Sequence, residues 1–160
     1  MMSIVILSVG RIKEPFLKAG IEEYLRRIRP YARVTVTEVP EESFGPHPGK
    51  AERAAVLSRE GDKLRRHLED DAYVVALDPK GKQVSSEEFA ELLETRALEG
   101  KSRVTFIIGG PLGLSSDILD RADQIISFSS MTFPHQLFRL MLVEQLYRAF
   151  KISRREPYHW

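Results

Sequence analysis

The sequence of 160 residues contains no cysteine, which excludes disulfide bonds and metal sites built from thiolates. Long hydrophobic runs are also missing, because the first apolar segment, IVILSV, is far too short to span a bilayer. No basic stretch precedes this segment and no small-residue cleavage site follows it, so we expect neither a secretory signal nor a membrane partner. The four histidines lack the spacing of metal ligands, and no metal site is expected. These absences leave the cytoplasm as the expected compartment.

The sequence has little excess of either charge, and its formal net charge is only +1. No global field therefore draws the chain to nucleic acid, and any basic surface has to be local. Three common motifs are absent as well: G-x-G-x-x-G for dinucleotides, G-x-x-x-x-G-K-[ST] for phosphates and G-x-S-x-G for a nucleophile. Their absence removes most common enzyme classes from consideration.

Five short segments rich in β-branched residues alternate with segments of helical spacing. The expected strands are SIVILSV, VTVTEV, YVVALD, RVTFIIGG and QIISFS. The expected helices cover residues 16–28, 54–68, 87–98 and 137–150. This alternation predicts an α/β fold, with a mostly parallel sheet that helices cover on both faces. Ser85 or Ser86 is placed to cap the third helix, and the length fits one domain over residues 1–160, with a mobile surface loop at residues 40–50.

Ligands of such sheets bind beyond the carboxyl ends of the strands, so the loops that follow the strands carry the most information. The sequence IIGGPLG, after the fourth strand, places Gly109, Gly110 and Gly113 within five residues. This density of glycine leaves backbone amides open to a ligand, whereas the alternative is a tight turn that needs glycine for its backbone angles. We expect a ligand loop here.

The last expected helix, residues 137–150, is apolar on nearly every side. Its strongly polar residues are Arg139, Glu144, Gln145 and Arg148. A surface helix of a monomer keeps a wider polar face, so this helix is expected to be covered on more than one side. A second copy of the chain would supply that cover in a homodimer, and the alternative is a central core helix within one subunit.

Several long motifs along the chain match one known family. The last third contains IIGGPLGLS, ISFSSMTFPHQLFRLMLVEQLYRAFKI and a terminal PYH, and the earlier part contains ILSVGRIKEPF, EVP and LDPKGK. In these motifs the sequence resembles the RlmH family of ribosomal RNA methyltransferases, which belongs to the SPOUT superfamily. The resemblance implies a SPOUT-type α/β fold with a trefoil knot in the C-terminal part, a feature that general rules of chain topology argue against.

The resemblance also implies an activity. Members of this family are homodimers that use S-adenosyl-L-methionine to methylate N3 of a pseudouridine in helix 69 of 23S rRNA, on the assembled ribosome. Two alternatives stay open: a related SPOUT methyltransferase with another RNA target, and a non-catalytic ribosome-binding module that has kept the fold. The intact glycine and SSMTF loops favour an enzyme over such a module.

Carried over by position, the resemblance places the cofactor at three strand-end loops. The expected contacts are Leu77, Gly109, Phe128, Ser129, Ser130, Met131, Thr132 and Phe133. Backbone amides and carbonyls of these loops would meet the edges of adenine, with apolar walls from Leu77, Met131 and Phe133. Core packing is the alternative role for Met131 and Phe133. A neutral purine and a sulfonium need no phosphate-type glycine nest, which accounts for the missing dinucleotide motif.

Methylation at N3 requires the loss of an imide proton, so the useful groups are a base or a cation near the developing oxyanion. The candidates for catalysis are His159, Tyr158 and Arg139, and those for RNA contact are Arg154 and His135. His135, close to a helix start, has a structural hydrogen bond as its alternative role.

The tail, residues 148–160, has a net charge of +3 and carries aromatic residues among its cations. This composition suits base stacking and phosphate contact with RNA, and the alternative is a solvated chain end. A second basic segment, RRIRPYAR, would extend the same surface.

Overall fold

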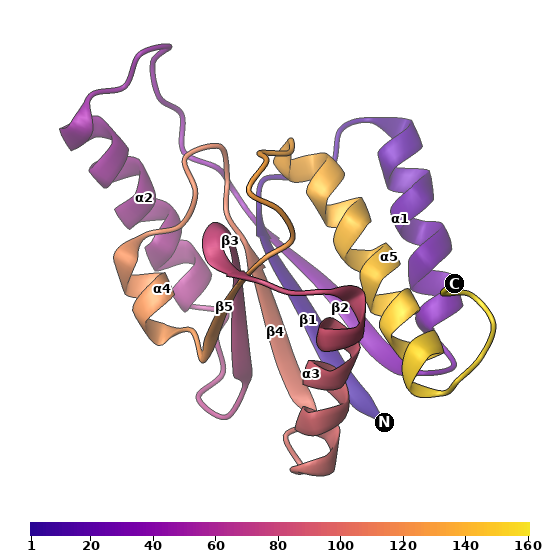
Figure 1. Ribbon diagram of the computed structural model, residues 1–160. Helices are drawn as coiled ribbons and strands as arrows, with labels where there is room; N and C mark the ends of the chain where they lie inside the picture. Colours follow the sequence, from indigo (N-terminus) through magenta and orange to yellow (C-terminus); the bar gives the residue numbers. More distant parts are fainter.

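The computed structural model describes all residues, 1–160, as a chain in which strands and helices alternate (Figure 1). The strands are β1 (Met2–Val9), β2 (Ala32–Val39), β3 (Tyr73–Gln83), β4 (Arg103–Ile108) and β5 (Gln124–Ser127). The helices are α1 (Pro15–Ile28), α2 (Lys50–Arg65), α3 (Ser86–Leu98), α4 (Ser116–Arg121) and α5 (His135–Ser153). All expected strands and helices are present, and only the short helix α4 was not expected.

The five strands form one parallel sheet in the order β2-β1-β4-β3-β5. Helices α1, α3 and α5 cover one face and α2 and α4 cover the other (Figure 1). Strand side chains alternate between the two cores: Ile6 of β1 belongs to the core that contains Leu142 of α5, and Leu7 belongs to the core that contains Ile118 of α4. The prediction of an α/β fold with helices on both faces is therefore confirmed.

A serine side chain caps the start of α3 and of α4. Ser85 caps α3, because its hydroxyl accepts a hydrogen bond from the Glu88 amide at 3.0 Å while the Glu88 carboxylate accepts one from the Ser85 amide at 3.1 Å. The second helix differs from the expected residues 54–68, since it begins at Lys50 and ends at Arg65. Its first turn is exposed and has no apolar spacing, which is why the pattern indicated a later start.

Helix α5 lies between α1 and α3 within one subunit. Gly20 of α1 permits a close approach, because a Cβ at that position would lie 3.0 Å from the side chain of Leu140. On the α3 side, the Ser86 hydroxyl donates to Gln145 at 2.8 Å. The subunit itself thus covers much of α5, as the core-helix alternative predicts, and leaves an outer face with the half-buried Met141.

Strand β3 is longer than the expected residues 73–78 because it pairs with β5 twice. Ile126 of β5 has Leu77 as one partner and Lys82 as another, and residues 78–81 bulge out between them. The returning chain passes so close to β5 that a Cβ at Gly81 would lie 2.8 Å from the backbone of Ile125 and Ile126. The trefoil knot stays a prediction.

Candidate functional site

A cavity of about 530 Å³ lies at the carboxyl ends of β3, β4 and β5. Its size falls within the ordinary range of small-molecule sites. Seven of the eight residues expected to bind the cofactor line it: Leu77, Gly109, Phe128, Ser129, Met131, Thr132 and Phe133. The eighth, Ser130, is exposed and is not part of the wall. Three loops that are far apart in the sequence therefore meet at one site.

The wall also contains residues that the sequence did not single out. They include Asp78, Pro79, Ile108, Pro111, Pro134 and Phe138. Most of them lie inside the quoted motifs and close to a predicted contact, so adding one or two neighbours to each predicted contact would have found them. Phe138 lies farther on, one turn into α5, and only the packing of that helix brings it to the wall.

The glycine loop after β4 is both a tight turn and a cavity wall. The Gly113 amide donates to the carbonyl of Gly110 at 3.0 Å, and Gly113 has a φ of 93°, which favours glycine. Gly109 lacks room for a side chain, because a Cβ there would lie 2.7 Å from the carbonyl carbon of Gly113. The two roles considered for this loop therefore coincide, since the turn creates the wall.

The loop after β5 is shaped by its own side chains. The Ser127 hydroxyl donates to the carbonyl of Ser129 at 2.8 Å, and the Ser129 hydroxyl accepts from the Met131 amide at 3.0 Å. Phe128 packs against the core, with its ring 4.9 Å from that of Phe138. Met131, in contrast, is 69% exposed while it lines the cavity, so core packing does not explain it.

His135, the first residue of α5, forms part of the polar wall. Its Nε2 atom lies 3.9 Å from the carboxylate of Glu41. Burial lowers the pKa of His135, and this effect exceeds the opposing effect of Glu41. The ring is therefore neutral at pH 7, the form that can accept a proton. His135 thus lines this cavity as well as being a candidate for RNA contact.

Arg139 lies one turn farther along α5 and does not line the cavity. Its guanidinium is 1% exposed and donates to the Ser8 hydroxyl at 2.8 Å, to the Gly10 carbonyl at 3.0 Å and to the Glu38 carboxylate. These bonds hold the start of α5 against the ends of β1 and β2. The geometry gives Arg139 a positioning role, and its direct catalytic role stays a prediction.

The predicted tail residues also lie outside the cavity wall. The Tyr158 hydroxyl donates to Glu144 at 2.9 Å, and burial, together with Tyr24 and Glu144, raises the pKa of Tyr158. The two ring nitrogens of His159 lie 2.7 Å from Glu87 and 2.9 Å from a guanidinium nitrogen of Arg148. Since Arg148 can only donate, His159 accepts at Nδ1 and donates from Nε2. Neither group is free to act as a base in this arrangement.

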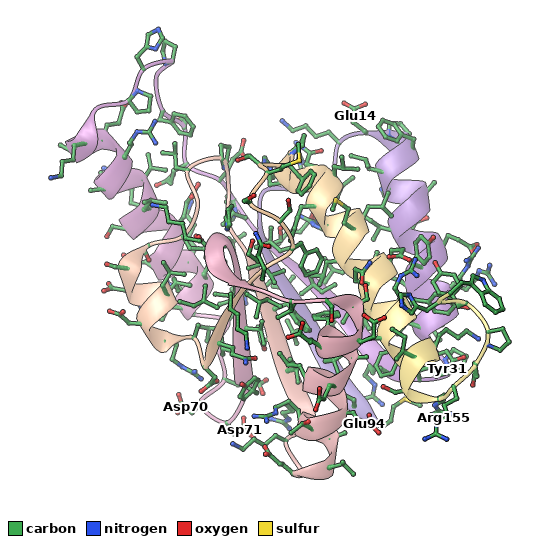
Figure 2. All side chains as sticks on the ribbon, viewed as in Figure 1. Glu14, Tyr31, Asp70, Asp71, Glu94 and Arg155 are labelled. Carbon is green, nitrogen blue, oxygen red and sulfur yellow. The ribbon has the colours of Figure 1, made fainter.

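The tail up to His159 packs against α1, α3 and α5, whereas Trp160 at its end is 97% exposed. Arg154 lies 5.0 Å from the ring of Tyr31, which stacks on Phe150, and Glu156 accepts hydrogen bonds from Tyr31 at 2.6 Å and Lys151 at 2.7 Å. Tyr31 and Arg155 lie at the opposite end of α1 and α5 from Glu14 (Figure 2).

Two absences complete the description. No group of three or more His, Asp or Glu side chains is placed to hold a metal ion. None of the helices is both long and apolar enough to cross a bilayer.

Comparison with known proteins identifies the family. The family model described as "Predicted SPOUT methyltransferase" matches residues 2–159. The chain is 52% identical over 158 residues to "Ribosomal RNA large subunit methyltransferase H" of Carboxydothermus hydrogenoformans, and 51% identical over 158 residues to proteins of the same name from Clostridium botulinum (strain 657) and Bacillus thuringiensis (strain Al Hakam). Each match covers 99% of both chains.

A solved structure shares the fold. It is described as a probable methylase family protein from Haemophilus influenzae Rd KW20, and it superposes with a TM-score of 0.50 at 14% identity, over 95% of this chain and 66% of that one. From the family match and the full-length relatives, the chain belongs to the SPOUT methyltransferase family and, within it, to the group of ribosomal RNA large subunit methyltransferase H.

Proposed function

We infer that this chain is an S-adenosyl-L-methionine-dependent methyltransferase of 23S rRNA, and we propose N3 of a pseudouridine in helix 69, on the assembled ribosome, as its target. One observation carries the proposal: the motifs shared with the family, IIGGPLG and SFSSMTFPH, fold together into the walls of a single cavity. Relatives that are about half identical over their whole length are named as large-subunit rRNA methyltransferases.

The cavity residues fit the cofactor. Leu77, Met131 and Phe133 offer apolar walls for a purine, and the loops at Gly109 and Ser129 bring backbone polar groups to the same wall. When bound, S-adenosyl-L-methionine supplies a methyl group on a positively charged sulfur. Asp78 is the one carboxylate of the wall, and its negative charge suits that cation.

The reaction also needs a group that takes the N3 proton. His135 is the one wall residue with a basic side chain, and its lowered pKa keeps the imidazole neutral and ready to accept a proton. The tail, with Arg154, Tyr158 and His159, then contributes RNA contact at a distance from the cavity. A catalytic step by His159 would first require it to leave Glu87.

The proposal includes a homodimer in the cytoplasm, where ribosomes are found. The outer face of α5 carries the half-buried Leu140 and Met141 beside Tyr24 of α1, around a shallow cavity. A second copy of the chain packed on this face would bury these side chains. One domain over residues 1–160 is part of the same proposal.

The decisive experiment is methyl transfer from labelled cofactor to ribosomes that lack the modification, with free 23S rRNA as comparison. We expect transfer to ribosomes, and digestion followed by mass spectrometry should show an N3-methylated pseudouridine from helix 69. A different methylated nucleoside would identify the related methyltransferase with another RNA target. Ribosome binding without any transfer would identify the non-catalytic module.

A further inference from the structure

A second cavity, of about 430 Å³, adjoins the cofactor cavity at the same edge of the sheet. Its walls come from the loop after β1, from the end of β2 and from the first turn of α5. The residues that line it include Gly10, Arg11, Lys13, Glu38, Glu41 and Gln136. Because His135 lines the first cavity and Gln136 the second, only the start of α5 separates them.

The backbone of the loop after β1 is held in place by hydrogen bonds. The Lys13 amide donates to the side-chain oxygen of Gln136 at 3.1 Å, and the Ile12 amide donates to the Glu38 carboxylate at 3.3 Å. The guanidinium of Arg139 binds the carbonyl of Gly10 at 3.0 Å. The loop is therefore preorganised, although the side chains of Arg11 and Lys13 are exposed.

The two cations of this loop have no partner in the protein. Arg11 and Lys13 are exposed, and neither side chain forms a hydrogen bond or an ion pair. Two free cations on a fixed loop beside a cavity suit an anionic ligand, because no internal ion pair has to be broken.

The carboxylates of the cavity cancel only part of these charges, because Glu41 alone opposes the two cations. Glu38 is already paired with the buried Arg139. Glu41 has only His135 nearby, at 3.9 Å, and that ring is neutral at pH 7. Glu41 can accept hydrogen bonds from hydroxyl groups, so the cavity combines cations for a phosphate with an acceptor for a ribose 2′-hydroxyl.

We propose that this second cavity holds the ribose-phosphate of the RNA beside the target base, with Arg11 and Lys13 on the phosphate and Glu41 on the ribose. This inference rests on the proposed function, since a base that reaches the cofactor cavity brings its own backbone to the adjoining surface. The first turn of α5 adds a favourable field, because it lacks a side-chain cap and any acidic residue. The second cavity thereby orients the nucleotide, and methyl transfer takes place in the cofactor cavity.

The test compares two double variants. Arg11→Ala with Lys13→Ala removes the proposed phosphate contacts. Arg66→Ala with Lys101→Ala is the matched control, because these cations are also exposed and unpaired but lie where α2 ends and β4 is about to begin, at the opposite edge of the sheet. For each protein, ribosome affinity is measured at several salt concentrations, together with KM and kcat for methyl transfer and the cofactor affinity by calorimetry.

We expect the Arg11/Lys13 variant to bind ribosomes about tenfold more weakly, with a plot of log K against log salt that is shallower by about 0.7, the value for one phosphate that is no longer neutralised on single-stranded RNA. Its cofactor affinity should match that of the wild type, and the control should match it in every measurement. In methyl transfer, most of the loss in kcat/KM of the Arg11/Lys13 variant should come from a higher KM.

Two results would overturn the inference and leave the proposed function intact. One is an active wild type whose Arg11/Lys13 variant has the ribosome affinity and salt slope of the control. The other is a variant that loses cofactor affinity to the same extent as ribosome affinity, which would assign the loop to the cofactor. A wild type that transfers no methyl group would overturn the proposed function, and this inference with it.

Discussion

At the scale of single residues, Gly109 shapes the cavity proposed for the cofactor, because it has no room for a side chain. Its φ is not positive, unlike that of Gly113, so the obstacle to a side chain is the backbone of Gly113 rather than a left-handed conformation. Any Cβ at this position forces the turn of residues 109–113 to open. The wall that the turn forms would then move with it.

Gly109→Ala should therefore weaken cofactor binding by at least tenfold, which is about 1.4 kcal/mol, and Gly109→Val should weaken it further. Calorimetry with S-adenosyl-L-methionine measures the change. Gly49→Ala is the control, because the Gly49 backbone is extended and nothing lies within 4 Å of an added Cβ. Equal affinities of Gly109→Ala and the wild type would show that the turn does not bear on the cofactor.

His135 should make the stability depend on pH. Burial lowers the pKa of its ring in the folded chain from the ordinary 6.5, so the unfolded chain binds more protons between that folded value and about 6.5. The free energy of unfolding should therefore rise with pH through this window and level off above it. Urea titrations at several pH values give the free energy of unfolding. Plotted against pH, this free energy should rise less steeply in the window for His135→Asn than for the wild type, whereas the variant at the exposed His67, His67→Asn, should follow the wild type.

At the scale of elements, α5 has one face in the core of the subunit and one outer face. Leu142 and Leu146 point into the core of the subunit and are fully buried. Changes at these positions therefore report on folding and not on dimer formation. Met141, next to Leu142 in sequence, lies on the outer face and is only half-buried.

The wild type should sediment at micromolar concentration with about twice the monomer mass of 18.3 kDa. Met141→Asp should give a folded monomer, because the charge stays in water once the copies separate. Leu142→Asp should unfold or aggregate, since it buries an unpaired charge inside the subunit. A wild type that sediments as a stable monomer would disprove the interface on α5.

At the scale of the whole molecule, the tail and the cofactor cavity are separate regions joined by α5. The helix has 19 residues and is about 28 Å long, with His135 at the cavity and the tail packed along its other half. Three hydrogen bonds hold the tail, and they join Tyr158 to Glu144, His159 to Glu87 and Glu156 to Tyr31. Removing the tail should therefore leave the cavity formed.

Truncation after Arg155 should keep cofactor affinity and dimer mass near normal and reduce methyl transfer to ribosomes by orders of magnitude. His159→Ala alone should lower turnover roughly 10²-fold if the ring transfers a proton, and much less if it only positions RNA. Arg154→Ala should chiefly weaken ribosome binding, with a shallower salt dependence. Full activity of the truncated chain would show that the tail takes no part in the reaction.

The sequence by itself determined the order of strands and helices, a serine cap at Ser85 or Ser86, and most of the predicted contact residues that line the cavity. These features depend on short-range patterns: period-two and period-3.6 spacing, one hydroxyl before a helix, and glycines after a buried strand. Each of the loops at Leu77, Gly109 and Phe128 could be recognised from its own sequence. Parallel strands place their carboxyl ends on the same side of the sheet, so the three loops could be expected to meet there.

Only the tertiary structure decided which side chains meet. Strand pairing and the packing of α5 brought Arg139 under the loop of Gly10, His135 beside Glu41, and Tyr158 and His159 onto the subunit's own helices. The partners in these contacts are far apart in the chain, so no local pattern carries them. Their physical basis is the folded geometry, in which burial and neighbouring charge set what each polar group can do.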